Sequence, residues 1–479
     1  MAFDFEDVTL RAKEVAAQPF ADPRKVPSWL LEITYDQWRD VRFRPEFALW
    51  RDRKVPFQVQ FFHPGLYYDR SVAVHTVEGD GVHDVTFSPS QFDYGRNDFG
   101  SRVPQDLGYA GFRIHYALKK ADYLDEVIVF LGATYFRAVG RDEVFGLSAR
   151  GLAVDTAESQ GEEFPYFREF WLVSPAPNAK EVVVYALLDS VRVSGAYRFV
   201  IHPGDATVVD VEAKLFLRRE VTKLGVAPLT SMFYFGENAV RHFPDFRPEV
   251  HDSDGLLLNT AEGEWLWRPL DNPDTLHVGS FQMKDPKGFG LIQRDRDFAN
   301  YQDLETRAEL RPSAWVEPHS AWGTGRVEIV EIPTNSDTND NVVAYWVPEK
   351  LPAPGEPLLL SYSLGFYGQD GNKPPGGRVV ATRRDSGPTD GALRFVVDFE
   401  GGKLARIPAD KVVRGVVTLS SEDKAGELIN QHVVKNPVTG GWRLVFQVRL
   451  SDDSATELRA FLDLAGDTLT ETWSYVVLP

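Results

Sequence analysis

Alternation between apolar and polar residues, with a period of two, recurs along most of this chain. The clearest example is Thr207–Leu217, in which Val, Ala and Leu residues occupy one face while Asp, Glu and Lys residues occupy the other. Such a pattern predicts an antiparallel β-strand with one buried and one solvated face. Turn residues separate many similar short runs, and the regular succession of strands and helices that builds a parallel sheet is missing. We therefore expect an all-β protein with large sheets packed face to face.

Helical patterns are scarce by comparison. Apolar residues at helical spacing occur in 5–15, 30–38 and 454–464, and each segment predicts a short helix, or a turn in the second case. Fully apolar runs of strand length, which predict buried strands, are Val127–Leu131, Val182–Leu188 and Val342–Trp346.

The segment 369–390 is rich in Gly, Pro, Asn and Asp and poor in apolar residues, which is typical of a domain boundary. Several strand patterns follow it, with the size and strand density of an immunoglobulin-like sandwich. We expect an N-terminal β-sandwich domain at 1–368, a linker at 369–377 and a C-terminal domain at 378–479.

The charge balance restricts the partners of this 479-residue chain. Lys and Arg total 52 and Asp and Glu total 70, which leaves a net charge of −18. A chain this acidic repels the phosphates of nucleic acids and anionic lipids, so neither is an expected partner. No apolar run is long enough for a membrane-spanning helix. The first residues lack the pattern of an export signal, so we expect any such signal to have been removed from this sequence.

Motifs for cofactors and metals are absent. The chain has no Cys, which excludes thiol nucleophiles, disulfides and Cys-ligated metals. Gly146–Arg150 approaches the serine-nucleophile motif, but Arg150 stands where the closing glycine is required. A loop that begins at Asp337 resembles a calcium loop, yet Val342 and Pro348 occupy the positions that need Gly and Glu. We expect neither a cofactor nor a metal.

Two acidic loops, Glu249–Gly255 and Thr334–Asn341, are the best candidates for chemistry. The second lies between two strand patterns, which is where rigid scaffolds usually carry functional side chains. A solvated turn rich in Asp and Asn is the alternative, and His251 has the alternative of a loop histidine bonded to the backbone. Glycosidic bonds are commonly cleaved by two carboxyl groups, one acting as acid and one as base or nucleophile. With no Cys, metal or cofactor motif, paired carboxyl groups are the simplest chemistry left.

Aromatic residues make up 13% of the chain. A β-rich core accounts for many of them, whereas a carbohydrate cleft would use others, because the flat apolar faces of sugars stack on aromatic rings. Core positions and surface ion pairs are the alternative. The candidates for such a cleft between the two acidic loops are Trp265, Trp267, Arg294 and Trp315.

Several longer strings carry a resemblance to a known family. They include Leu131–Arg137, Phe145–Leu152, Gly161–Pro165, Lys223–Phe233, His251–Ser253, Arg311–Trp315 and Asn339–Trp346. Together they resemble the periplasmic glucan biosynthesis proteins G and D of Gram-negative bacteria, the OpgG/OpgD (MdoG/MdoD) family. The similarity covers essentially the whole chain and, on overall impression, favours the D branch.

The resemblance implies a galactose-mutarotase-like β-sandwich joined to a smaller immunoglobulin-like β-sandwich. It also implies an anomer-inverting glycoside hydrolase or transglycosylase that acts on β-1,2-glucan during osmoregulated periplasmic glucan biosynthesis. The family's general acid falls on Asp340 and its suspected base on Asp252. The remaining candidates for substrate binding are Asp337, Asn339, Asn341, Tyr135, Arg137, Arg150 and Trp346.

The family relays its proton transfers through a sugar hydroxyl and a chain of water molecules. The gap between the two carboxyl groups is therefore expected to exceed the roughly 6.5–9.5 Å of ordinary inverting enzymes. The sequence does not separate hydrolysis from transfer or cyclisation, and it does not determine the length of the product. It also leaves open the role of the C-terminal domain and the oligomeric state, for which a homodimer is one candidate. A non-catalytic glucan-binding scaffold is the alternative function, and a sugar mutarotase rests on fold analogy alone.

Overall fold

A computed structural model of the chain describes residues 3–239, 244–369, 373–389, 391–420, 426–450 and 455–478. Strands hold 48% of the residues and helices 9%, which confirms the predicted all-β class. The chain divides into two compact units. Unit 1 contains residues 1–229, 316–326 and 345–367, and unit 2 contains residues 230–315, 327–344 and 368–479.

Unit 1 holds three of the four α-helices of the described residues and fifteen complete strands, β1 to β14 and β25. Its helices are α1 (Phe5–Ala16), α2 (Ser28–Leu31) and α3 (Tyr35–Arg39). Its strands are β1 (Arg42–Phe43), β2 (Phe57–Phe62), β3 (Ala73–Glu78), β4 (Gly81–Asp84), β5 (Phe92–Asp93), β6 (Gly111–Lys120), β7 (Tyr123–Leu131), β8 (Tyr135–Ala138), β9 (Ser148–Arg150), β10 (Leu152–Val154), β11 (Tyr166–Val173), β12 (Val182–Asp189), β13 (Val193–His202), β14 (Thr207–Leu217) and β25 (Pro357–Tyr367). The chain passes between the units within β15 (Leu224–Ser231), β22 (Ser313–Pro318), β23 (Thr324–Glu331) and β24 (Val342–Pro348).

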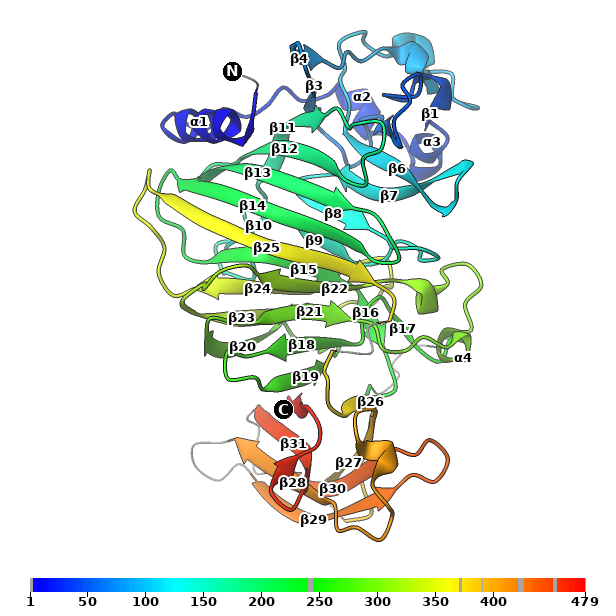
Figure 1. Cartoon of the computed structure of the whole chain (residues 1–479), viewed down its shortest axis with the longest axis vertical. Coiled ribbons are helices and arrows are strands. Elements are labelled where there is room, and N and C mark those ends of the chain that lie inside the picture. Colours follow the sequence, from blue (N-terminus) through cyan, green and yellow to red (C-terminus); the bar gives the residue numbers. More distant parts are fainter. Residues whose placement is uncertain are drawn as a thin grey trace. The chain divides into compact units, whose positions relative to one another are not determined.

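Two sheets face each other in unit 1. One runs in the order β2-β6-β7-β8-β9 and the other in the order β25-β14-β13-β12-β11-β3-β4, with only the β3–β11 pair of this unit parallel among the described pairings (Figure 1). Aromatic rings from both sheets meet between them: Phe130 of β7 lies 5.3 Å from Phe199 of β13, and Phe112 of β6 lies 5.0 Å from Phe170 of β11. Such interdigitation of inner faces is what makes a β-sandwich core.

The strand predicted at Thr207–Leu217 is confirmed as β14. It pairs antiparallel with β13 on one side and with β25 on the other. Val209, Val211 and Leu215 are fully buried. The predicted alternation therefore reflects one face in the sandwich core and one face turned outward.

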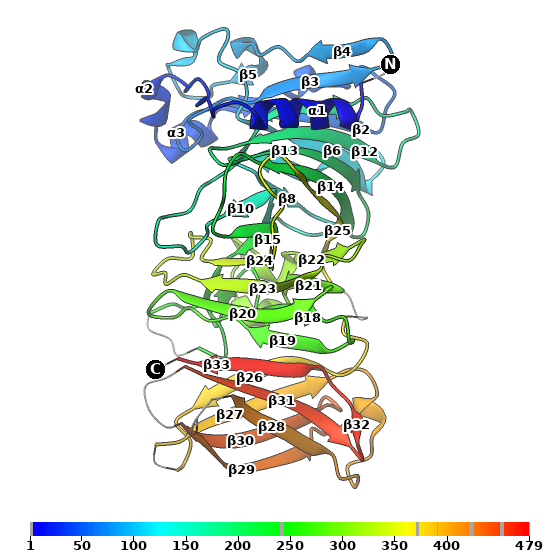
Figure 2. The ribbon, with the colours of Figure 1, turned by 90° about the vertical axis from the view of Figure 1, so that its left-hand side faces the viewer.

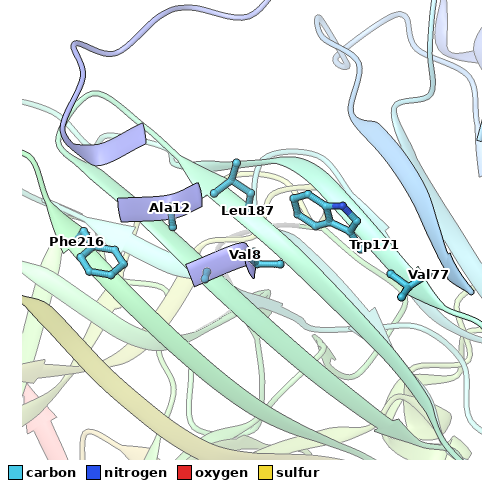
Figure 3. Packing of buried hydrophobic residues seen from close by; sticks show 7 residues of the cluster. Val8, Ala12, Val77, Trp171, Leu187 and Phe216 are labelled. Carbon is cyan, nitrogen blue, oxygen red and sulfur yellow. The ribbon is translucent and has the colours of Figure 1, made fainter. Parts of the chain in front are cut away.

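Helix α1 covers part of that outward face and confirms the first helical prediction. Asp4 and Asp7 form a capping box, and Lys13 lies in the last turn, where a cation complements the helix dipole. Val8 and Ala12 are fully buried against Trp171, Leu187 and Phe216 of the sheet (Figure 3). Burying a valine side chain contributes about 1.5 kcal/mol or more, so this contact outweighs the helix's own marginal stability.

The prediction of a helix at 30–38 is confirmed in part, and the prediction of a helix at 454–464 is wrong. The segment 30–38 contains two short helices, α2 and α3, rather than one. The helix predicted at 454–464 is wrong, because Thr456–Leu464 forms strand β31, with residue 454 outside the described residues. Leu458, Ala460 and Leu462 are fully buried in alternation, and β31 pairs with β28 and β33.

Unit 2 contains helix α4 (Phe298–Tyr301) and the remaining strands. These are β16 (Phe233–Phe235), β17 (Val250–His251), β18 (Gly255–Asn259), β19 (Trp265–Pro269), β20 (His277–Lys284), β21 (Gly288–Ile292), β26 (Arg378–Asp385), β27 (Leu393–Glu400), β28 (Arg414–Ser420), β29 (Gly426–Lys435), β30 (Trp442–Leu450), β31, β32 (Asp467–Thr468) and β33 (Thr472–Val477). Short 3₁₀ helices occur at Pro45–Phe47, Pro89–Gln91 and Gly100–Arg102 in unit 1, and at Ala308–Leu310 and Leu404–Arg406 in unit 2.

The last strands of unit 2 form two packed layers (Figure 2). One layer is the sheet β26-β27-β30-β29, and the other contains β28-β31-β33. Phe395 and Phe446 of the first layer contact Trp473 of the second at 5.6 and 5.8 Å between ring centroids. Strand β33 also pairs in parallel with β19. The predicted linker at 369–377, of which 370–372 lie outside the described residues, stays a prediction.

Within the described ranges, no helix is both long enough and apolar enough to cross a membrane.

Candidate functional site

Asp252 lies directly after β17 in unit 2 and is 7% exposed. Its backbone N–H donates to the carbonyl of Met232, at 2.8 Å, beside strand β16. Its carboxylate forms an ion pair with the guanidinium of Arg311, whose side chain is also largely buried. The backbone therefore fixes the position of Asp252, and Arg311 fixes the direction and charge of its side chain.

Asp340 occupies the loop between β23 and β24 and is exposed. Its neighbour Asn341 is buried and holds the loop in place. The Asn341 amide donates to the carbonyls of Phe233 and Ile332, and its oxygen accepts from the Phe233 N–H at 2.9 Å. Because Phe233 belongs to β16, which pairs with β17, Asn341 attaches the Asp340 loop to the strands that position Asp252.

Arg311 connects the two acidic loops electrostatically. Burial lowers the pKa of Arg311, and the charges of Asp337 and Asp340 partly oppose that shift. Asp252, Asp337 and Asp340 therefore surround one guanidinium, although residues 252 and 340 are far apart in the sequence. The structure brings together both predicted catalytic residues and Asp337.

Arg247 holds the same loop by a second set of ion pairs. Its guanidinium donates to Asp337 at 2.8 Å, to Asp303 at 3.3 Å and to Asp245 at 2.7 Å. The hydrogen bonds that Arg247 donates to Asp245, the largest cause, and to Asp337 raise the pKa of Arg247. Three segments of unit 2 are thus tied to one cation.

A pocket of about 420 Å³ borders the Asp340 loop, and it is lined by Asn272, Pro273, Asp274, Pro333, Thr334, Asn335 and Asn339. Asn272 holds the backbone of Thr334 in place. Its side-chain oxygen accepts from the Thr334 N–H and its side-chain amide donates to the Thr334 carbonyl, both at 2.9 Å. Amide and carboxylate side chains at an open pocket are suited to hydrogen bonds with sugar hydroxyls.

A cluster of acidic groups lies behind Asp252 in unit 2. Burial, followed by the charge of Asp254, raises the pKa of Asp295 to about 10. Burial, followed by the charge of Glu249, raises the pKa of Glu237 to about 7. Glu249, His251 and Asp295 bring ligand atoms within 4.8 Å of one another, an arrangement that can hold a metal ion or share protons. The prediction that the chain needs no metal stays a prediction.

His251 belongs to this cluster and is 1% exposed. Its ring contacts Gln293 at 3.0 Å through Nδ1 and Glu249 at 3.2 Å through Nε2. The Gln293 amide faces the carbonyls of His251 and Ala308, so its oxygen faces the ring and Nδ1 carries a proton. The expectation of a backbone-bonded loop histidine is wrong, because His251 ends a strand and binds side chains.

The predicted aromatic and Arg candidates of unit 2 divide into two groups. Trp265 is partly exposed and stacks on buried Trp315, with ring centroids 5.5 Å apart. Trp267 is buried under the guanidinium of Arg294 at 3.6 Å, and Arg294 forms two hydrogen bonds with Glu471, at 2.6 and 3.0 Å. Trp267 and Arg294 are therefore engaged in holding unit 2 together.

The remaining candidates, Tyr135, Arg137, Arg150 and Trp346, lie in unit 1. Arg150 is 2% exposed, with its guanidinium 5.1 Å from the ring of Tyr135, and it donates to Glu162 at 2.6 Å. Trp346 is fully buried near Trp322. Arg137 is partly buried.

Comparison with known proteins decides the family. Residues 3–477 match the family model described as "Periplasmic glucan biosynthesis protein, MdoG". The chain belongs to this family. It is also 51% identical over 491 residues to "Glucans biosynthesis protein G" of Ralstonia nicotianae, an alignment that covers 100% of this chain and 97% of that protein.

These findings confirm the predicted family and its role in periplasmic glucan biosynthesis. The expectation of the D branch is not supported, because the similar protein carries the G name.

Sequence reasoning missed the cations around the two Asp loops. Arg311 begins the string Arg311–Trp315 that carries the family resemblance, but nothing in the sequence pointed to a role for it. No sequence pattern pointed to Arg247 either. Their partners lie 59 and 90 positions away, at Asp252 and Asp337, so no local spacing reveals them. Arg247, two residues before the loop Glu249–Gly255, was the nearest signal in the sequence, whereas Arg311 lies far from both loops along the chain.

Proposed function

We propose that this protein is an anomer-inverting glycoside hydrolase or transglycosylase that acts on β-1,2-glucan in the periplasm. Asp340 is the general acid, and Asp252 activates the nucleophile through water. The observation that carries this proposal is the shared environment of the two residues around Arg311, with Asp340 exposed and Asp252 buried.

In the proposed reaction, one bond to C1 of the sugar breaks and one new bond to C1 forms. Asp340 gives its proton to the oxygen of the glycosidic bond, and the bond between that oxygen and C1 breaks. A water molecule or a sugar hydroxyl attacks C1 from the opposite face and forms the new bond, which inverts the anomer. The proton of the nucleophile passes toward Asp252. Water as nucleophile gives a shorter glucan, and a sugar hydroxyl gives a transferred or cyclic product.

One observation favours a second candidate, a non-catalytic glucan-binding scaffold. The Asp252 carboxylate is ion-paired with Arg311, and a cation so close stabilises the carboxylate and weakens it as a base. Under this candidate, the amide-rich pocket beside Asn339 binds glucan and no bond is broken.

Incubation of the pure protein with linear β-1,2-glucan tests the two candidates. Mass spectrometry and NMR linkage analysis follow the products, and a ring is recognised because it lacks the mass of one water. We expect Asp340→Asn to lower the rate by about 10²-fold or more. Glu262→Gln, at an exposed turn of unit 2, is the matched control and keeps the wild-type rate. Unchanged glucan with the wild-type protein, despite measurable binding, would establish the scaffold instead.

A further inference from the structure

Unit 1 contains a pocket of about 200 Å³ that the Asp252–Asp340 chemistry does not use. Three segments and Ala110 form it, and the segments are 67–72, 130–135 at the turn between β7 and β8, and 164–170 at the start of β11. This volume is below the roughly 300–1,000 Å³ of pockets for drug-sized ligands, and it suits a single ring.

Aromatic rings dominate the pocket. Tyr67 and Phe164 stand at its rim, 78% and 53% exposed, and Tyr135 also lines the pocket and is partly exposed. Phe167 and Phe170 are buried and close the floor. Large exposed rings beside a concave apolar surface are characteristic of a binding site, since they would otherwise be covered by the fold.

One residue that lines the pocket carries a buried hydroxyl without a hydrogen-bond partner in the part of the chain that the structure describes. Tyr166 lines the pocket and is 3% exposed, and among the described residues its hydroxyl has no hydrogen-bond partner. Burial raises the pKa of Tyr166 to about 12, so the hydroxyl keeps its proton and can donate. An unsatisfied buried hydroxyl destabilises the folded chain, and a ligand hydroxyl that accepts from it would remove this cost.

The rim is held in place without a ligand. The Arg150 guanidinium lies 5.1 Å from the ring of Phe164 and 5.1 Å from the ring of Tyr135. Arg70 lies over the ring of Tyr166 at 4.9 Å and is bound to Asp69 at 2.8 and 3.2 Å. Rings fixed by cation contacts lose little conformational freedom on binding, so a ligand binds more tightly.

We propose that this pocket of unit 1 binds one glucopyranose ring of β-1,2-glucan, whereas Asp252 and Asp340 belong to unit 2. The proposal rests on the proposed function for its substrate. The apolar face of the sugar stacks on Phe164 and Tyr67, and a sugar hydroxyl accepts from the Tyr166 hydroxyl. The Asp69 carboxylate at the rim accepts hydrogen bonds from further sugar hydroxyls. The net charge of −18 argues against a nucleotide base as the stacked ring.

Binding is measured on the full chain carrying Asp340→Asn, so that turnover does not change the ligand. Isothermal titration with linear β-1,2-glucan gives the dissociation constant, and saturation-transfer NMR reports which sugar protons touch the protein. In this background we expect Phe164→Ala to weaken binding about five- to tenfold, in line with the loss of one stacked ring. Tyr123→Ala is the matched control, because Tyr123 is 63% exposed on unit 1 and does not line the pocket.

Tyr166→Phe separates a binding role from a structural one. It removes a hydroxyl that makes no hydrogen bond with any residue that the structure describes, so we expect an unchanged or higher melting temperature together with about threefold weaker glucan binding. A merely structural hydroxyl would leave the dissociation constant unchanged, and that result would overturn the proposal.

Activity and binding measurements together distinguish a failure of the pocket proposal from a failure of the proposed enzymatic function. If the wild type converts glucan while Phe164→Ala and Tyr166→Phe bind like Tyr123→Ala, the pocket proposal is overturned and the proposed function stands. If glucan binds in the pocket and the wild type makes no product, the pocket proposal is supported and the enzymatic function fails. If no variant binds glucan, the pocket proposal is overturned.

Discussion

At the scale of single residues, Arg311 determines the charge around the candidate catalytic pair. It is the cation next to Asp252, and it also interacts with the charges of Asp337 and Asp340. Asp337 is also paired with Arg247, so two guanidinium groups and three carboxyl groups belong to the two acidic loops and their surroundings. Asp340 is the exposed member of this group, which is the position that a general acid needs in order to reach a substrate.

Replacing Arg311 tests this arrangement. Arg311→Gln leaves the carboxylate of Asp252 without its cation, so we expect about a 10²-fold lower rate of glucan conversion and a lower melting temperature. Arg311→Lys keeps the charge and should recover part of both, which separates the electrostatic role from packing. The readouts are the rate of product formation and thermal unfolding. A wild-type rate in folded Arg311→Gln protein would contradict the role given to this residue.

At the scale of elements, buried polar groups hold the loop that carries Asp340. Asn341 anchors the Asp340 loop to β16, and Arg247 ties the same loop to Asp303 and Asp245. The strands themselves were predictable, because alternation in Thr207–Leu217 is a local property of the chain.

The failed helix at 454–464 shows the limit of local patterns. Leu458, Phe461 and Leu462 have helical spacing, but Leu458, Ala460 and Leu462 equally have strand spacing. Pairing with β28 and β33 decides between them, and that pairing is non-local. The candidate site has the same limit: the acidic loops could be found from their composition, whereas the partners of Asp252 and Asp337 could not.

Arg247→Ala tests the loop anchor. It removes the cation shared by Asp245, Asp303 and Asp337, so we expect a loss of about 3 kcal/mol of unfolding free energy, because the pairs are largely buried. The loop Thr334–Asn341 should also become sensitive to limited proteolysis.

Arg24→Ala is the control for Arg247→Ala. Its ion pair with Asp106 is exposed, with side chains 77% and 68% accessible, so its removal should change stability little and leave the loop resistant. Equal proteolysis of the two variants would show that Arg247 does not hold the loop.

At the scale of the whole molecule, stability depends on pH through buried acids whose pKa values are raised. Asp295 keeps its proton to about pH 10 in the folded chain, whereas the same group has a value of 3.8 when unperturbed. Between these values the folded chain binds more protons than the unfolded chain. The free energy of unfolding therefore falls as pH rises through this interval, and one proton contributes at most about 1.4 kcal/mol per pH unit.

Asp295→Asn removes this titration while its amide can still donate a hydrogen bond to Glu249. We expect the variant to be more stable than the wild type at pH 8 and to differ from it less at pH 5, because the wild-type penalty accumulates as pH rises. Glu237, whose pKa is raised to about 7, contributes with the same sign and remains in both proteins. Urea unfolding followed by Trp fluorescence at several pH values measures the difference, with the exposed Glu262→Gln as the control. Parallel profiles of unfolding free energy against pH for Asp295→Asn and the wild type would mean that Asp295 does not hold the extra proton. The negative charge of the acidic groups around Asp295 would then be neutralised in another way, such as by a cation bound at Glu249 and His251.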